Sequence, residues 1–148
     1  MDLFAERGFE RTRFVDVAKR AGVSHGTVGV YFPTKEALLR GVVERMAEPE
    51  MDQVVALIDG FQGTTAELLE TLGLLWWEHC QEERITSLMR VVEAELGNFP
   101  ELAETFRERV YDPVIDLFGR ILKRGVERGE LACEDPTPYA ELAFGGLS

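Results

Sequence analysis

The stretch of sequence that decides the fold runs from Phe14 to Phe32 and reads FVDVAKRAGVSHGTVGVYF. Its first half carries apolar residues at helical spacing, and Gly22 then interrupts the pattern, as expected where a turn separates two short helices. Ser24 is a predicted N-cap, whose hydroxyl accepts a hydrogen bond from an amide in the first turn of the second helix. Ala18 supplies the small residue that two steeply crossing helices need where they touch. The stretch therefore predicts a helix-turn-helix motif.

The side chains of this motif are expected to divide into a buried set and an exposed set. The buried set comprises Val17, Ala21, Val23, Val28 and Tyr31. An ordinary helical hairpin inside a helical core is the alternative, because such hairpins are common. The exposed residues favour DNA binding instead. The second helix opens with the small or polar run SHGT, which lets a helix backbone approach base edges in the major groove.

The remainder of the chain also has helical periodicity, and no sustained alternation indicates strands. We expect an all-α protein. Helices are predicted at residues 1–7, 14–21, 25–32, 35–59, 64–81, 84–96, 100–128 and from 138 to the end. Pro49 and Pro113 fall inside two of these segments, which are expected to be bent or split.

Charge is distributed unevenly along the 148 residues, which carry a net charge of −11. Residues 1–45 hold eight basic and six acidic side chains, a balance of +2, so the following 103 residues hold −13. The contrast indicates two modules, of which only the first is suited to approach a polyanion. We therefore predict a DNA-binding domain at 1–45 and a C-terminal helical domain at 46–148. The latter is expected to be incomplete, because the sequence ends in mid-pattern without a helix cap.

Several classes of protein are disfavoured by composition and by missing motifs. The two cysteines, Cys80 and Cys133, provide neither a disulfide framework nor metal-ligand spacing, so we expect a reducing cytoplasm, no metal and no cofactor. No run approaches the ~20 apolar residues of a membrane span, and the first residues do not resemble a signal peptide. No nucleophile, phosphate-loop or metalloprotease motif is present, so we do not expect an enzyme.

Three segments give the chain a family resemblance. They are LFAERGFE from Leu3, VAKRAGVS from Val17 followed by Gly26-Thr27, and YFPTKEALL from Tyr31. Together they resemble the DNA-binding domain of TetR-family transcriptional repressors over about residues 3–45. The resemblance implies a homodimer of helical subunits on double-stranded operator DNA. It also implies a variable C-terminal domain that binds a small effector, whose binding releases the operator.

The resemblance also implies roles for individual residues. Ser24, His25, Gly26, Thr27 and Gly29 would face the major groove, whereas Thr12, Arg13, Tyr31 and Lys35 would contact phosphates. The chain departs from the family pattern at Val28-Gly29-Val30, where a larger residue and aromatics are usual. Gly29 also lowers helix stability by ~1 kcal/mol relative to alanine. Arg13 stands where the family often has a Ser or Thr cap.

The C-terminal segments carry large apolar residues at helical spacing, most of which are expected to be core. A subset is predicted to converge on an apolar effector cavity: Trp76, Trp77, His79, Cys80, Met89, Val92, Phe106 and Val110. Because adjacent tryptophans cannot both face one core, one of the two is expected to face a pocket or a partner. A dimer contact is expected at Tyr139, Leu142, Ala143 and Phe144. A helical ligand-binding or dimerisation module without operator binding remains the alternative.

Overall fold

The computed structural model describes residues 2–132, without the side chains of residues 47–51. This part of the chain is helical and contains no strand, which confirms the all-α prediction. The elements are α1 (Asp2–Arg11), α2 (Phe14–Ala21), α3 (His25–Tyr31), α4 (Lys35–Gly60), α5 (Thr65–Gln81), α6 (Glu83–Leu96), α7 (Pro100–Phe106), a π-helical turn η1 (Arg107–Tyr111) and α8 (Asp112–Glu127). The helix predicted from 138 and the predicted dimer contact at 139–144 lie outside the described residues.

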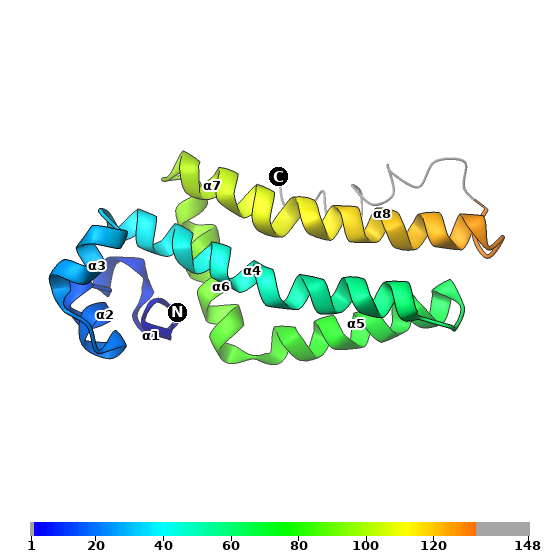
Figure 1. Cartoon of the computed structure of the whole chain (residues 1–148), viewed down its shortest axis with the longest axis horizontal. Helices are drawn as coiled ribbons and strands as arrows, with labels where there is room; N and C mark the ends of the chain where they lie inside the picture. The colour runs from blue at the N-terminus through cyan, green and yellow to red at the C-terminus, as the bar shows by residue number, and fades with distance from the viewer. Residues whose placement is uncertain (1, 133–148) are drawn as a thin grey trace.

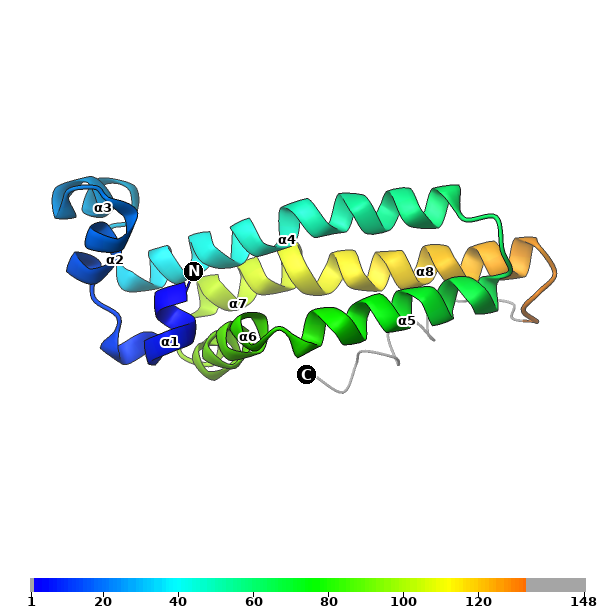
Figure 2. The same ribbon diagram turned by 90° about the horizontal axis from the view of Figure 1, so that it is seen from below.

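Two groups of helices form the two ends of the molecule. Helices α1, α2 and α3 gather at one end, while α4, α5 and α8 run side by side toward the other (Figure 1, Figure 2). Helix α8 contacts both α4 and α5, and α6 packs against α1. Helix α4 therefore connects the helix-turn-helix to the distal bundle, and α6 is a second connection between the two ends.

Local signals in the sequence explain the geometry of the helix-turn-helix. Gly22 ends α2 in the left-handed conformation, with φ of 68°, and its N–H donates to the carbonyls of Ala18 and Lys19. Ala18 is buried where α2 meets α3. Both assignments were expected from sequence. The buried set was partly wrong, because Ala21, Val23 and Tyr31 are exposed. The seven-residue α3 buries only Val28, so its flanking residues remain outside.

The two internal prolines affect their helices differently. Helix α4 continues through Pro49, whereas the predicted segment 100–128 is divided into α7, η1 and α8. Pro113 has no N–H to donate, and in a regular helix its ring would clash with the carbonyl of Arg109. The π-turn immediately before it relieves this crowding by widening the backbone. The prediction that the segment is split is therefore confirmed only for Pro113.

Two apolar clusters hold the helices together. The first comprises Phe4, Phe9, Leu38, Leu39, Val42, Val43, Leu88, Val92 and Leu102. The second, at the distal end, comprises Ile58, Leu68, Leu117 and Ile121. Because the first cluster takes side chains from α1, α4, α6 and α7, the helix-turn-helix end shares a core with the helices that follow it. The proposed boundary at residue 45 falls inside α4 and stays a prediction.

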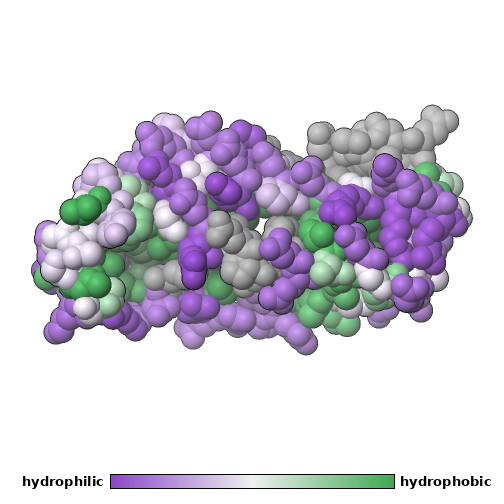
Figure 3. All heavy atoms as spheres, in the orientation of Figure 1, coloured by the Kyte–Doolittle hydropathy of each residue, from purple (hydrophilic) through white to green (hydrophobic). Residues whose placement is uncertain are grey.

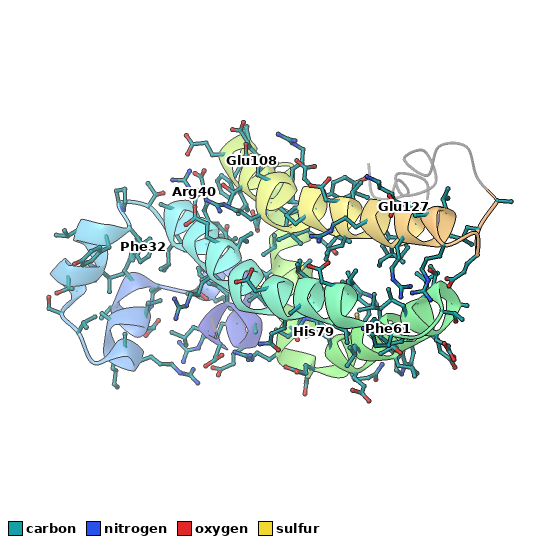
Figure 4. All side chains as sticks on the ribbon, turned by 45° about the vertical axis from the view of Figure 1, so that its right-hand side comes forward. Phe32, Arg40, Phe61, His79, Glu108 and Glu127 are labelled. Carbon is teal, nitrogen blue, oxygen red and sulfur yellow. The ribbon has the colours of Figure 1, made fainter. Side chains whose placement is uncertain are left out.

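Polar contacts reinforce these connections. Arg40, labelled on α4 in Figure 4, pairs with Glu101 on α7. At the distal corner, Arg124 of α8 donates to the carbonyls of Phe61 and Gly63 at 3.0 and 2.9 Å. It also donates to the Thr65 hydroxyl at 3.1 Å. The α4–α5 turn is therefore held to α8 by one guanidinium group.

Candidate nucleic-acid interface

Helix α3 is seated on the protein by its cap and by one buried side chain. The Ser24 hydroxyl accepts a hydrogen bond from the Thr27 N–H at 3.0 Å and lies 2.7 Å from the Thr27 hydroxyl. The predicted N-cap is therefore confirmed. Val28 is 6% exposed, and the ring of His25 packs edge-on against Phe14 of α2, with 6.2 Å between centroids. These contacts set the orientation of α3.

The buried Val28 determines which side of α3 faces solvent. Successive residues of an α-helix are rotated by about 100°, so Gly26 and Val30 lie roughly opposite Val28. Gly29 and Thr27 flank this outward edge, and all four residues are exposed. Of the predicted groove-facing residues, Gly26, Thr27 and Gly29 therefore lie on one exposed side of α3. A Cβ added at Gly29 would meet nothing within 4 Å, so the backbone is open to an approaching surface there.

Sequence reasoning missed Val30, which is 81% exposed. The sequence contains enough information to predict this exposure. Val28 was expected to be buried, and a residue two positions further along a helix lies on nearly the opposite side. Green and pale groups gather over α2 and α3 at the left end of the molecule, while much of the remaining visible surface is purple (Figure 3). The exposed end of the helix-turn-helix thus combines apolar and small polar side chains.

Arg13 stands at the entrance to α2, as predicted. It occupies the N-cap position without a side-chain capping bond. Its guanidinium group instead donates to Asp16 at 3.0 Å, and Arg7 lies 3.4 Å from the same carboxylate. The hydrogen bond from Arg13 lowers the pKa of Asp16 below its ordinary value. Arg13 remains exposed and retains donors for a phosphate.

Thr12 lies elsewhere than the prediction assumed. Its side chain is 1% exposed, and its hydroxyl lies 2.7 Å from the carbonyl of Gly8 and 3.2 Å from that of Leu3. The hydroxyl closes the kinked end of α1, where Gly8 has φ of 76°. The sequence pattern did not reveal this role because the bonds depend on the kink. We therefore correct the expectation that the Thr12 side chain contacts phosphate.

Tyr31 and Lys35 bracket the turn between α3 and α4. Tyr31 is 75% exposed, so its hydroxyl is accessible. The Lys35 ammonium donates to the Glu10 carbonyl at 3.1 Å and lies 4.5 Å from the centroid of the Phe9 ring. This contact holds the charged group near the end of α1. An ammonium group has three donors, so two remain for an outside acceptor.

The predicted effector residues divide into three groups. Val92 belongs to the first apolar cluster, and two residues pack against this cluster: Phe106, at the end of α7, and Val110, inside the π-turn. Trp76, Trp77 and Cys80 are exposed on α5, where the tryptophans are 58% and 65% exposed. Both tryptophans thus face outward, although only one was expected to leave the core.

The two remaining predicted effector residues are half-buried. They are Met89 on α6 and His79 on α5, and the ring of His79 lies 6.2 Å from that of Trp76. The structure therefore does not enclose the eight predicted residues in one cavity. A cavity of about 230 Å³ lies instead between α1, α2 and α4, where Leu3, Val17 and Leu38 contribute to its wall.

The described part of the chain offers neither a metal-binding cluster nor a helix that could cross a membrane. Residues 2–132, apart from the side chains of 47–51, contain no group of three His, Cys, Asp or Glu side chains placed to hold a metal ion. Among the helices described, none has both the length and the apolar character needed to cross a membrane.

The described chain is all-α and contains a helix-turn-helix whose second helix is capped and faces solvent. This arrangement is typical of DNA-binding proteins of the helix-turn-helix class. Comparison with protein families agrees. Residues 1–42 match the model described as bacterial regulatory proteins, tetR family, and residues 67–147 match the AefR-like transcriptional repressor C-terminal domain. The chain belongs to the TetR family of transcriptional regulators. These relatives are regulators rather than enzymes, as expected from sequence.

Individual relatives extend the comparison. The chain is 27% identical to the uncharacterized HTH-type transcriptional regulator YfiR of Bacillus subtilis, over 95% of this chain and 67% of that protein. It is 26% identical to the fatty acid degradation regulator FadR of Bacillus halodurans, with a TM-score of 0.78 over 97% of this chain and 73% of that one. Thermus thermophilus FadR, a repressor in complex with lauroyl-CoA, is 30% identical, with a TM-score of 0.66 over 96% and 72% of the two chains.

Proposed function

We propose that this chain acts as a homodimeric, ligand-responsive repressor that binds a pseudo-palindromic operator. The observation that carries the proposal is the outward edge of α3, which is exposed, rich in glycine and set in place by Ser24 and Val28. Such a surface suits a helix whose backbone enters the major groove. The matched family supports DNA as its partner.

Base readout in this proposal belongs to Ser24, His25, Gly26, Thr27 and Gly29. Tyr31 and Lys35 bind phosphates at the end of α3, and Arg13 does so at the entrance to α2. These phosphate contacts would position the protein, while the groove-facing residues would specify sequence. The net charge of +2 on residues 1–45, against −13 on the rest, directs the helix-turn-helix end toward DNA.

The proposed effector is a small molecule with an apolar chain, such as a fatty acyl-CoA. The support is the likeness to the two FadR proteins, one of which was solved with lauroyl-CoA. Phe106 precedes the π-helical turn and Val110 lies within it, and such turns are frequent at functional sites. The other proposed effector-binding positions are Met89, Val92 and the α5 residues Trp76, Trp77, His79 and Cys80.

Release from DNA would follow a shift between two arrangements of the helices. Helix α4 leads directly from α3, and the Arg40–Glu101 pair ties it to α7 beside the proposed effector positions. Helix α6 packs on α1 and carries Met89 and Val92. A ligand that separates α6 from α7 would therefore move the recognition helix through both connections. It favours release only if it binds the released arrangement more tightly.

One observation favours the second candidate, a dimerisation or ligand-binding module that does not bind an operator. Leu74, Leu75, Trp76 and Trp77 follow one another on α5 and are all exposed. Exposed apolar groups in this number are typical of a surface that receives a partner. Such a module would fold and dimerise but would enrich no DNA.

A selection experiment distinguishes the two candidates. Purified protein is mixed with genomic fragments at near-physiological salt, and the retained DNA is sequenced. We expect one pseudo-palindromic site to be enriched, and lauroyl-CoA to release it more effectively than coenzyme A alone. His25→Ala should lose affinity for this site selectively, whereas the distant Lys123→Ala on α8 should bind normally. A folded dimer that enriches no site would refute the repressor.

A further inference from the structure

Val30 belongs to neither of the two apolar clusters. It is the most exposed of the large apolar side chains in residues 2–132, disregarding the side chains of 47–51. The neighbouring Val28 packs inside, so Val30 is not needed to attach α3 to α2. A single exposed apolar side chain is common on protein surfaces, so only the position of Val30 on α3 points to a partner.

The position of Val30 on α3 indicates which kind of partner it would contact. Val30 and Gly26 lie one turn apart at the outward edge, and Gly29 and Thr27 are at their sides. Neither glycine has a side chain, and no atom outside the helix backbone lies within 4 Å of a Cβ built at Gly29. Val30 is therefore the bulkiest group along the edge that would enter the groove, ahead of Thr27. It would reach the base pairs as the helix backbone approaches.

The chemistry of the major groove leaves one good partner for such a group. Valine has no hydrogen-bond donor or acceptor in its side chain, whereas base edges in the groove present mainly donors and acceptors. The exception is the C5-methyl group of thymine. Phosphates would gain nothing from a valine, because they bind positive charge and hydrogen-bond donors.

We propose that Val30 is a specificity-determining residue that selects a thymine in each operator half-site through contact with its 5-methyl group. This inference rests on the proposed operator binding and adds an element of sequence preference to it.

The test uses the operator recovered by the genomic selection. Each thymine is replaced in turn by deoxyuridine, which removes the methyl group and keeps the pairing edge. For the unmodified protein, we expect one thymine per half-site at which the replacement weakens binding about fourfold, the equivalent of one buried methylene. Replacement in both half-sites should weaken binding about sixteenfold.

Two variants identify the side chain that senses the methyl group. Val30→Ala should bind the thymine operator more weakly and should no longer distinguish thymine from deoxyuridine at that position. Lys123→Ala also shortens an exposed side chain, but on α8 and far from α3, and should retain the full discrimination. Neither change removes a buried contact, so both proteins should fold.

The outcomes separate this inference from the proposed function. If the protein binds its operator and every deoxyuridine replacement leaves the affinity unchanged, the thymine contact is refuted and operator binding stands. If Val30→Ala keeps the same discrimination, another residue reads the methyl group and the assignment to Val30 fails. If no site is enriched at all, the operator function fails, and the inference fails with it.

Discussion

Replacing Gly29 by alanine should make the protein more stable and its DNA binding weaker. Gly29 lies inside α3 with an ordinary helical φ, and an added Cβ would meet nothing within 4 Å in the free protein. Alanine therefore brings only its higher helix propensity, worth about 1 kcal/mol. For a chain of this size that corresponds to a rise in Tm of about 2 to 4 °C.

The effect on DNA binding has the opposite sign. If the backbone at Gly29 closely approaches base edges, the new methyl group must displace either the helix or the DNA. Overpacking a close interface typically costs about 1 to 3 kcal/mol. The operator affinity should therefore fall about fivefold to 160-fold for each half-site.

Thermal unfolding and operator titration measure the two effects separately. Gly73→Ala is the matched control, because Gly73 is also exposed, lies inside a helix and has open space around its Cβ position. It should gain a similar stability and bind DNA normally. If Gly29→Ala binds the operator as tightly as Gly73→Ala, α3 does not approach DNA through this edge. A loss of stability would show that the space around Gly29 is not open.

Three further changes test other parts of the structure. Gly125→Ala should lower the unfolding free energy by about 1 to 2 kcal/mol despite its helix propensity, because the new Cβ would lie 2.5 Å from the Leu131 side chain; urea unfolding measures this. Hydrogen bonds from Thr65, followed by Arg128, lower the pKa of Glu130 from 4.5 to about 2. The stabilisation that the ionised Glu130 gives to the folded protein should be complete above about pH 4.5 and should decline as the pH falls toward 2. Urea unfolding midpoints measured at a series of pH values test this. Lys35→Ala should weaken binding to every DNA sequence and reduce the salt slope by about two, one for each subunit of the dimer.

Controls exist for each of these predictions. Gly119→Ala lies on the same helix as Gly125 with nothing near its Cβ position, so it should stabilise α8. Glu130→Gln should make the urea midpoint less dependent on pH at low pH. An unchanged pH dependence would mean that another carboxylate is responsible for it. Lys123→Ala removes an equal charge far from α3. A sequence-selective loss for Lys35→Ala would contradict its phosphate role.

Much of the helix-turn-helix was predictable because its signals are local. Gly22 ends α2 since a left-handed residue is needed there, and Ser24 caps α3 through an amide three residues away. The split near Pro113 follows from the missing N–H of proline. Each of these depends on the chemistry of one residue and its immediate neighbours, so the sequence alone was sufficient.

The effector residues were less predictable because helical periodicity does not say what a face will meet. Trp76 and Trp77 carry the same apolar signal as core residues, yet both are exposed on α5. Val92 carries that signal too and is fully buried, because α6 passes between α1 and α7. The partners of each face come from segments far apart in the chain, and only the packed structure brings them together.

The sequence by itself determined the helical class, the helix-turn-helix and the set of side chains available to DNA. The tertiary structure decided which of these side chains remain accessible. In the folded protein the Thr12 hydroxyl is buried at the end of α1, the Lys35 ammonium donates to the Glu10 carbonyl and Val30 is exposed. Helix formation depends on neighbours within one turn, whereas burial and direction depend on how the helices are packed, which no single stretch of sequence specifies.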